Sequence, residues 1–161
     1  MAERAATVPD AADAQQVADA VGARLWSADA ASQALGMRLL QVAPGTATLE
    51  MAVRADMLNG FGTCHGGVIT ALADSAFAFA CNSHGETTVA SGLAVDFVKP
   101  ARAGDRLSAC AVELHRGRGR SGLYDIAVTN QAGELVASVR GRSHRVGRVA
   151  PDAAADPPPS A

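Results

Sequence analysis

The sequence predicts an α+β domain in which an antiparallel sheet curls around one long central helix. Three observations support this prediction: a long alanine-rich helical segment, two extended segments before it and four after it. Short separators between extended segments favour antiparallel pairing, because a parallel link needs a long crossover. One helix covers only one face of a six-stranded sheet, so we expect the sheet to wrap around the helix.

The chain length suits one folded unit with a tail at each end. The 161 residues are 48% hydrophobic, which is enough to bury a substantial core. We expect a folded domain at residues 18–146, a flexible arm at 1–17 and a disordered proline- and alanine-rich tail at 147–161. The net charge of −2 provides no basic field for nucleic acid, and no apolar run is long enough to span a membrane.

The three cysteines, Cys64, Cys81 and Cys110, fit no disulfide or zinc framework. Unpaired thiols suit the reducing cytoplasm, and residues 1–16 lack the apolar stretch of a secretory signal. We therefore expect a cytoplasmic protein with no metal site.

The first elements are a short helix and a hairpin. Residues 29–35 form a helical stretch that ends at Gly36. Two extended segments, 37–42 and 46–53, flank the turn Pro44-Gly45, and the second alternates apolar with polar residues. This pattern predicts a β-hairpin.

The central helix follows a loop at residues 57–64, which contains the sequence Asn-Gly-Phe-Gly. His65-Gly66-Gly67 opens the helix, which runs to about Ser83 and is rich in alanine, a strong helix former.

Four extended segments follow the central helix, separated by turns rich in glycine and proline. They span residues 89–98, 106–115, 122–129 and 135–146. We expect these segments to form a meander in which each strand pairs with the next.

The central helix carries a single charged residue, Asp74, among small apolar side chains. A buried carboxylate is costly unless it is paired, and no basic residue lies one helical turn away on either side. A structural aspartate bonded to Ser75, Thr70 or a distant arginine is one interpretation. An isolated acid on an apolar helix fits a general base or a nucleophile better.

Gly66 and Gly67 supply the second half of a candidate site. The first amides of a helix have no intrahelical partner and lie at the positive end of its dipole. Without side chains, the two glycines let a ligand such as the oxyanion of a thioester approach the backbone, although a simple tight turn also explains them.

The spacing of the two halves predicts a dimer. Gly66 and Asp74 are eight positions apart, which corresponds to about 12 Å along a helix at about 1.5 Å per residue. One carbonyl group cannot meet both within one chain. We expect Asp74 of one chain to meet Gly66 of another across a two-fold axis.

Two motifs resemble the signature of hotdog-fold acyl-CoA thioesterases, and most closely the phenylacetate-degradation branch. The motifs are residues 58–67 and 72–78, and the likeness covers residues 30–147 through further matches at 80–83, 95–97, 122–126 and 140–145.

The resemblance implies a hotdog fold, a homotetramer built as a dimer of dimers, and an active site at the dimer interface. It implies hydrolysis of acyl-CoA, with hydroxyphenylacetyl-CoA as the expected substrate and other aryl- or acyl-CoA thioesters as alternatives. Asp74 would attack the thioester or activate water, and the Gly66 amide of another chain would polarise the carbonyl. Asn59 would orient the water or the acyl group, and His65 would shape the loop. No metal or redox cofactor is expected, since CoA is part of the substrate.

Four arginines are candidates for binding the CoA phosphates, because the guanidinium group suits bidentate contacts. Arg116 and Arg118 lie in a glycine-rich loop, and Arg142 and Arg145 lie in the last extended segment. A solvated hairpin tip is the alternative for the loop. A role in nucleic-acid binding is not expected, because no aromatic platform accompanies these residues.

Two further positions have competing interpretations. Some animal relatives carry a serine on the strand after the helix; an ungapped comparison places Ala90 there, with Ser91 adjacent. Ser91 is therefore a candidate substrate contact; the alternative is that it is an ordinary polar residue of a strand. Gly67, at the start of the helix, is also a candidate substrate contact.

Cys64 and His65 do not form a nucleophile pair, because adjacent side chains rarely reach attack geometry and no acid orients them.

Two other functions are consistent with the fold class. One is a non-catalytic acyl-CoA-binding hotdog domain, and the other is a hotdog dehydratase, which pairs a histidine with an acid across the site. The sequence leaves open the acyl group, the choice between nucleophile and general base for Asp74, and which arginines bind phosphate.

Overall fold

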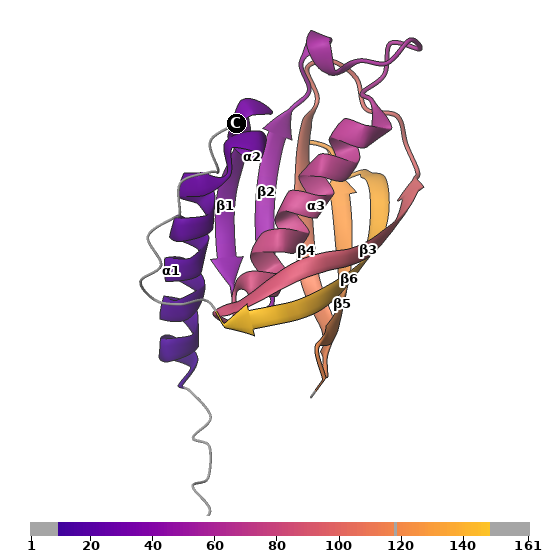
Figure 1. Ribbon diagram of the computed structural model, residues 1–161. Helices are drawn as coiled ribbons and strands as arrows, with labels where there is room; N and C mark the ends of the chain where they lie inside the picture. Colours follow the sequence, from indigo (N-terminus) through magenta and orange to yellow (C-terminus); the bar gives the residue numbers. More distant parts are fainter. Residues whose placement is uncertain (1–9, 118, 149–161) are drawn as a thin grey trace, which may run out of the picture.

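The computed structural model describes residues 10–117 and 119–148, and Figure 1 shows its sheet curling around helix α3. The elements, in chain order, are α1 (Ala11–Ala28), α2 (Ala30–Ala34), β1 (Met37–Ala43), β2 (Thr46–Ala52), the 3-10 turn η1 (Ala55–Met57), α3 (Gly66–Asn82), β3 (Glu86–Phe97), β4 (Arg106–Arg116), β5 (Ser121–Thr129) and β6 (Leu135–Arg148). The α+β class and the long central helix are as the sequence predicts.

The six strands form one antiparallel sheet in the order β1-β2-β4-β5-β6-β3. Helix α3 crosses the concave face of this sheet (Figure 1). The apolar face of each strand points at the helix, as in β5, where Tyr124, Ile126 and Val128 are buried while Asp125 and Ala127 are exposed. Alternate residues of the strand therefore contribute apolar side chains to the core.

The two phenylalanines of α3 fill different parts of the core. Phe77 is fully buried and its ring lies 5.1 Å from that of Tyr124 on β5. Phe79 faces the other way and its ring lies 6.1 Å from that of Trp26 on α1. A Cβ on Gly141 would come within 3.1 Å of the Phe77 ring, so this strand position must be small for the helix to pack closely.

The position of β3 corrects the predicted meander. Strands β4, β5 and β6 pair in sequence, but β3 pairs with β6 at the far edge of the sheet and not with β4. Reaching β4 from β3 means crossing three strand spacings, about 14 Å at about 4.8 Å each. The link of residues 98–105 can extend about 26 Å at about 3.3 Å per residue, so its length allowed either neighbour. Val98 donates its backbone N–H to Val136 at 2.9 Å, which holds the start of the link against β6.

Helix α1 corrects the predicted flexible arm, because residues 11–17 are helical. Ala18, Val21 and Leu25 form an apolar stripe that packs on the core, and alanine-rich segments favour helix once such a stripe is buried. The other residues of the predicted arm and tail, 1–9 and 149–161, lie outside the described residues, and Gly147 belongs to β6.

Helix α1 lies beside β1 at the edge of the sheet (Figure 1). Gln15 donates from Nε2 to the backbone oxygen of Val42 at 2.9 Å, and Gly22 lets the helix approach the same valine. The helix therefore covers one sheet edge, while β3 at the other edge pairs only with β6 in the described chain. Within the described residues, no helix is both long and apolar enough to cross a membrane.

Replacing Phe77 by alanine should lower the free energy of unfolding by about 3–5 kcal/mol, because it empties a fully enclosed site between α3 and the sheet. The matched control is Phe61→Ala, since Phe61 is 92% exposed and should change stability by less than about 0.5 kcal/mol. Urea unfolding of both variants measures the difference. Equal losses would contradict the described core.

Candidate active site

The loop before α3 is held by its own side chains. The Asn59 Oδ1 accepts the backbone N–H of Phe61 at 2.9 Å and that of Thr63 at 3.3 Å, and its Nδ2 donates to the Thr63 hydroxyl at 3.0 Å. These contacts form an Asx-type turn. The predicted catalytic residue Asn59 therefore lies at the site, but in this structure its amide organises the loop.

His65 caps the first turn of α3. Its Nδ1 accepts the backbone N–H of Gly67 at 2.9 Å, and its own backbone N–H donates to Met57 at 2.8 Å. The N–H of Gly66 has no acceptor within the described residues. Gly66 thus carries the free donor of the turn, as its predicted oxyanion role requires, while the amide of Gly67 is committed to the cap.

The two glycines make room for rings. A Cβ on Gly66 would lie 2.8 Å from Cζ of Phe97, and a Cβ on Gly67 would lie 3.1 Å from Nδ1 of His65. Neither glycine has a positive φ, so close approach and not backbone conformation accounts for both. The neighbour that needs Gly66 to be small is the Phe97 ring, which the sequence did not reveal.

A groove of about 580 Å³ opens beside this turn. Its volume lies within the usual range for ligand sites, roughly 300–1,000 Å³. Its lining residues include His65 and Gly66 at the start of α3 and the apolar residues Phe61, Ile69 and Phe97. Asp74 is not among the lining residues. One chain therefore contributes Gly66 to the groove but not Asp74.

Asp74 is half-buried and has no hydrogen-bond or ion-pair partner among the described residues. Burial raises the pKa of its carboxyl group above the ordinary value of 3.8. Along the same face of α3, at helical spacing, lie Gly67, Ala71 and Ala78, none of which is buried. Among the described residues Asp74 is therefore an unpaired acid, beside small residues that are not fully buried.

Cys64 and Cys81 are poor nucleophiles in this setting. Burial raises the pKa of the Cys64 thiol, with a further contribution from the nearby Asp105 carboxylate, and burial raises the pKa of Cys81 to about 12. Both thiols are therefore protonated at neutral pH, when only a thiolate would attack.

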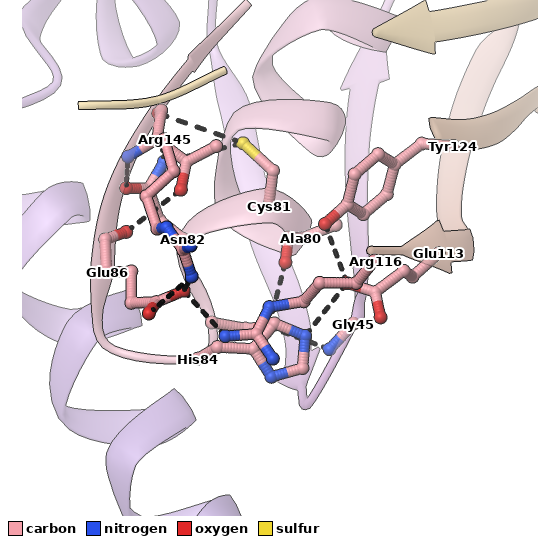
Figure 2. Close-up of polar contacts among 12 residues, drawn as sticks. Gly45, Ala80, Cys81, Asn82, His84, Glu86, Glu113, Arg116, Tyr124 and Arg145 are labelled. Atoms are coloured by element: carbon pink, nitrogen blue, oxygen red, sulfur yellow. Dashed lines mark hydrogen bonds and ion pairs between the residues drawn. The ribbon is translucent and has the colours of Figure 1, made fainter. Parts of the chain in front are cut away.

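Arg116, Arg142 and Arg145 are not among the residues that line the groove beside this turn. Arg116 and Arg145 both bind the carboxylate of Glu86, at 2.6 Å and 2.9 Å (Figure 2). Burial alone would raise the pKa of Glu86, but the hydrogen bonds from the two arginines lower it overall. These two guanidinium groups thus already have an anionic partner, and Arg118 lies outside the described residues.

Ser91 and Arg142 form a separate contact across β3 and β6. The Ser91 hydroxyl donates to the backbone oxygen of Arg142 at 3.0 Å. The Arg142 side chain lies over β3, where a Cβ on Gly92 would come within 2.8 Å of its Nη2. Arg142 is exposed, and its guanidinium has no acceptor among the described residues, so it is more available to a ligand than Arg116 or Arg145.

A polar cluster at the far end of α3 was missed by sequence reasoning. Glu113 accepts the Tyr124 hydroxyl at 2.7 Å and lies 2.9 Å from Nε2 of His84 (Figure 2). Burial, and then the contact with Glu113, raise the pKa of Tyr124. The three residues are far apart in sequence, so no local pattern indicated the contact; it joins the end of α3 to β4 and β5.

A free helix-start amide beside an apolar groove, with an unpaired carboxylate on the same helix, provides the donor and the base that acyl-transfer hydrolases use. Comparison with known proteins agrees with this class. Residues 61–137 match the family model described as the thioesterase superfamily. The chain is 46% identical over 123 residues to the acyl-coenzyme A thioesterase PaaI of Escherichia coli (strain K12), covering 76% of this chain and 87% of that protein.

Two further comparisons extend the match. The chain is 31% identical over 109 residues to acyl-coenzyme A thioesterase 13 of Homo sapiens, covering 66% of this chain and 77% of that one. The structure of the E. coli PaaI protein from the phenylacetic acid degradation operon superposes with a TM-score of 0.81 at 43% identity, covering 83% of this chain and 96% of that chain. The chain belongs to the thioesterase superfamily. The predicted hotdog fold and the thioesterase class are thereby confirmed.

The role of the Gly66 N–H can be separated from the space that Gly66 provides. Gly66→Ala should lose activity through its clash with Phe97, and the Gly66→Ala/Phe97→Ala double variant should match the kcat of Phe97→Ala alone, because the clash is gone. Gly66 is the first helical residue and His65 before it is extended (φ −61°, ψ 131°), a setting that accepts proline. Gly66→Pro with Phe97→Ala should therefore fold but lose kcat by about 10²–10³-fold, because only the N–H is removed. Equal kcat values for the two double variants would show that this N–H has no catalytic role.

Asp74→Asn should make the protein more stable at pH 7, because the folded state then no longer carries a desolvated charge. Because the pKa of Asp74 is raised in the folded state, ionisation of Asp74 destabilises the parent protein as the pH rises. As the pH falls toward 4, Asp74 becomes protonated in the folded state, and the stability advantage of Asp74→Asn over the parent should shrink. Thermal unfolding of both proteins between pH 4 and pH 8 tests this, with the exposed Asp96→Asn as control. A variant less stable than the parent at pH 7 would mean that Asp74 has a stabilising partner.

Proposed function

We propose that this thioesterase hydrolyses acyl-CoA thioesters to the free acid and CoA, with Asp74 of one chain and the Gly66 N–H of another in each site. The observation that carries the proposal is the division of the site: Gly66, whose N–H has no acceptor among the described residues, lines the groove, and Asp74 does not. The names of the E. coli and human relatives as acyl-coenzyme A thioesterases support the substrate class.

In the proposed reaction the thioester carbonyl lies in the groove with its oxygen at the Gly66 N–H. Charge that develops on this oxygen as the carbonyl carbon becomes tetrahedral is stabilised by the amide and by the positive end of α3. Asp74 either accepts a proton from an attacking water or attacks the carbon itself, and water then opens the resulting anhydride. In the general-base route water adds to the carbonyl carbon, the C–S bond breaks, and the CoA thiolate takes up the proton that Asp74 accepted. In the nucleophilic route the Asp74 carboxylate displaces the CoA thiolate, and water then hydrolyses the anhydride to the free acid and the Asp74 carboxylate.

The raised pKa of Asp74 suits the general-base route, because a more basic carboxylate accepts a proton more readily. Loss of this group should cost about 10²–10⁴-fold in rate, the usual contribution of a positioned acid or base.

Two surfaces of the chain suit the proposed dimer. Among the described residues, the strand β3 pairs only with β6, and on its other edge the side chain of Asn82 binds the backbone N–H and C=O of Thr88. The remainder of this edge belongs to a strand of twelve residues, and an edge of this length normally pairs or is covered. The face of α3 around Asp74 carries small residues, among them Gly67, Thr70, Ala71 and Ala78, so a second α3 could approach closely. We expect two antiparallel α3 helices at this interface, and two such dimers in a tetramer.

The groove walls favour an aryl acyl group. Phe61 and Phe97 provide aromatic surface beside the Gly66 amide, and stacked aromatic pairs contribute about 0.5–1.5 kcal/mol beyond the area that they bury. We therefore propose hydroxyphenylacetyl-CoA or a related aryl-CoA as the preferred substrate, in line with the operon of the E. coli relative.

We expect the reaction to need no metal or redox cofactor, since a carboxylate, an amide and water supply its chemistry. We also propose that the protein works in the cytoplasm, where its three free cysteines would stay reduced. For the CoA phosphates, Arg142 is the candidate that has no acceptor in the described chain, and Arg116 and Arg145 could contribute only while bound to Glu86.

Subunit complementation tests the shared site. Asp74→Asn and the Gly66→Pro/Phe97→Ala double variant should each be nearly inactive alone. In a hetero-oligomer purified through two different tags, each mixed dimer should regain about half of the wild-type rate, because one of its two sites is intact. The control is a mixed oligomer in which the Gly66→Pro/Phe97→Ala chain carries Asp74→Asn as well, so that neither chain has a carboxylate at position 74. If mixing restores no activity, the amide and the carboxylate act within one chain.

A panel of CoA thioesters, with thiol release as the readout, tests the substrate class. Hydroxyphenylacetyl-CoA should show the highest kcat/KM, above straight-chain acyl-CoA of similar size by about tenfold, which corresponds to about 1.4 kcal/mol of ring contact. Enoyl-CoA should not be hydrated. Binding of the whole panel without turnover would instead support a non-catalytic acyl-CoA-binding domain.

A further inference from the structure

The histidine before α3 is held in one protonation state by geometry. Nδ1 of His65 lies 2.9 Å from the backbone nitrogen of Gly67. A backbone N–H can only donate, so Nδ1 must offer its lone pair. The imidazole is then neutral and carries its proton on Nε2. This assignment follows from the donor and needs no choice between ring tautomers.

We propose that His65 is a positioning residue, a neutral Nε2-protonated imidazole whose Nδ1 binds the Gly67 amide and so leaves the Gly66 amide as the free donor of the turn. The inference rests on the proposed function, because it concerns the same amide. It excludes His65 as the general base, since Nδ1 is occupied by the cap and Nε2 has no lone pair to offer. Proton transfer is thereby left to Asp74.

The backbone around His65 supports the same role. Its backbone N–H donates to Met57 at 2.8 Å, and its carbonyl accepts the N–H of Val68 at 2.9 Å and that of Ile69 at 3.2 Å. Together with the ring contact, these bonds satisfy the first-turn amides of residues 67, 68 and 69. The donor that is left in this turn is the one at Gly66, beside the groove.

The cap also explains why position 67 is a glycine. A Cβ at this position would lie 3.1 Å from Nδ1 and 3.4 Å from Cε1 of His65, where the ring must lie to accept the amide. Gly67 therefore takes part in the site by admitting the His65 ring. This reassigns it from a substrate contact, as the sequence suggests, to a partner of the positioning residue.

Substitutions of His65 separate the cap from other roles. Asparagine places its Oδ1 on Cγ, as histidine places Nδ1, and is among the most favourable capping residues. His65→Asn should keep kcat within about threefold of the parent, whereas His65→Ala should lower kcat by about 5–30-fold with little change in KM, as expected for loss of a cap that orders the turn. His65→Gln, with its acceptor one bond further out, should resemble alanine. If asparagine is as impaired as alanine, or if alanine is fully active, the positioning role is wrong.

Nitrogen NMR of ¹⁵N-histidine-labelled protein tests the tautomer without substrate. The chain has four histidines, so the His65 signals are identified as those missing from the His65→Asn spectrum. The expected spectrum at neutral pH shows a protonated Nε2 and an unprotonated Nδ1. A proton on Nδ1, or a cationic ring, would overturn the inference. Because this readout needs no turnover, it can fail while the proposed hydrolysis stands, and it can succeed if no CoA thioester is cleaved.

Discussion

The burial of one side of α3 is the constraint on which the rest of the structure depends. Leu72, Ala76 and Phe77 are fully buried against the sheet, and enclosing them requires the strands to curl around the helix. The same packing fixes which side of α3 stays open. Asp74 lies on that open side, with no partner among the described residues, and the Gly66 amide lies about half a helix length away. The fold therefore presents both chemical groups but keeps them apart.

Much of this arrangement could be predicted because it depends on local patterns. The lone charge on an apolar helix marked Asp74, and the unpaired amides of any helix start marked Gly66. The position of β3 could not be predicted in this way, because the link at residues 98–105 is long enough to reach two different neighbours. The start of α1 was missed although Ala18, Val21 and Leu25 show helical spacing, since the alanine-rich composition resembled that of a loose arm.

The arrangement of individual side chains at the turn depends on contacts that no spacing reveals. Asn59 uses its amide within the loop, and the His65 ring binds the Gly67 amide. The packing of Phe97 against Gly66 brings the end of β3 to the start of α3, two segments about 30 residues apart whose pairing depends on how the sheet closes. The sequence motifs identified this loop as part of the candidate site. The separate roles proposed for its residues follow from their hydrogen bonds and packing contacts.

The central claim is that each site combines the carboxylate of one chain with the amide of another. A crystal structure of Asp74→Asn with a non-cleavable acyl-CoA analogue tests it most directly. If the site is shared, the carbonyl oxygen of the analogue lies about 3 Å from the Gly66 nitrogen of one chain. The substituted side chain at position 74 of the other chain then faces the carbonyl carbon. An analogue whose carbonyl contacts residues 66 and 74 of the same chain, or neither, would contradict it.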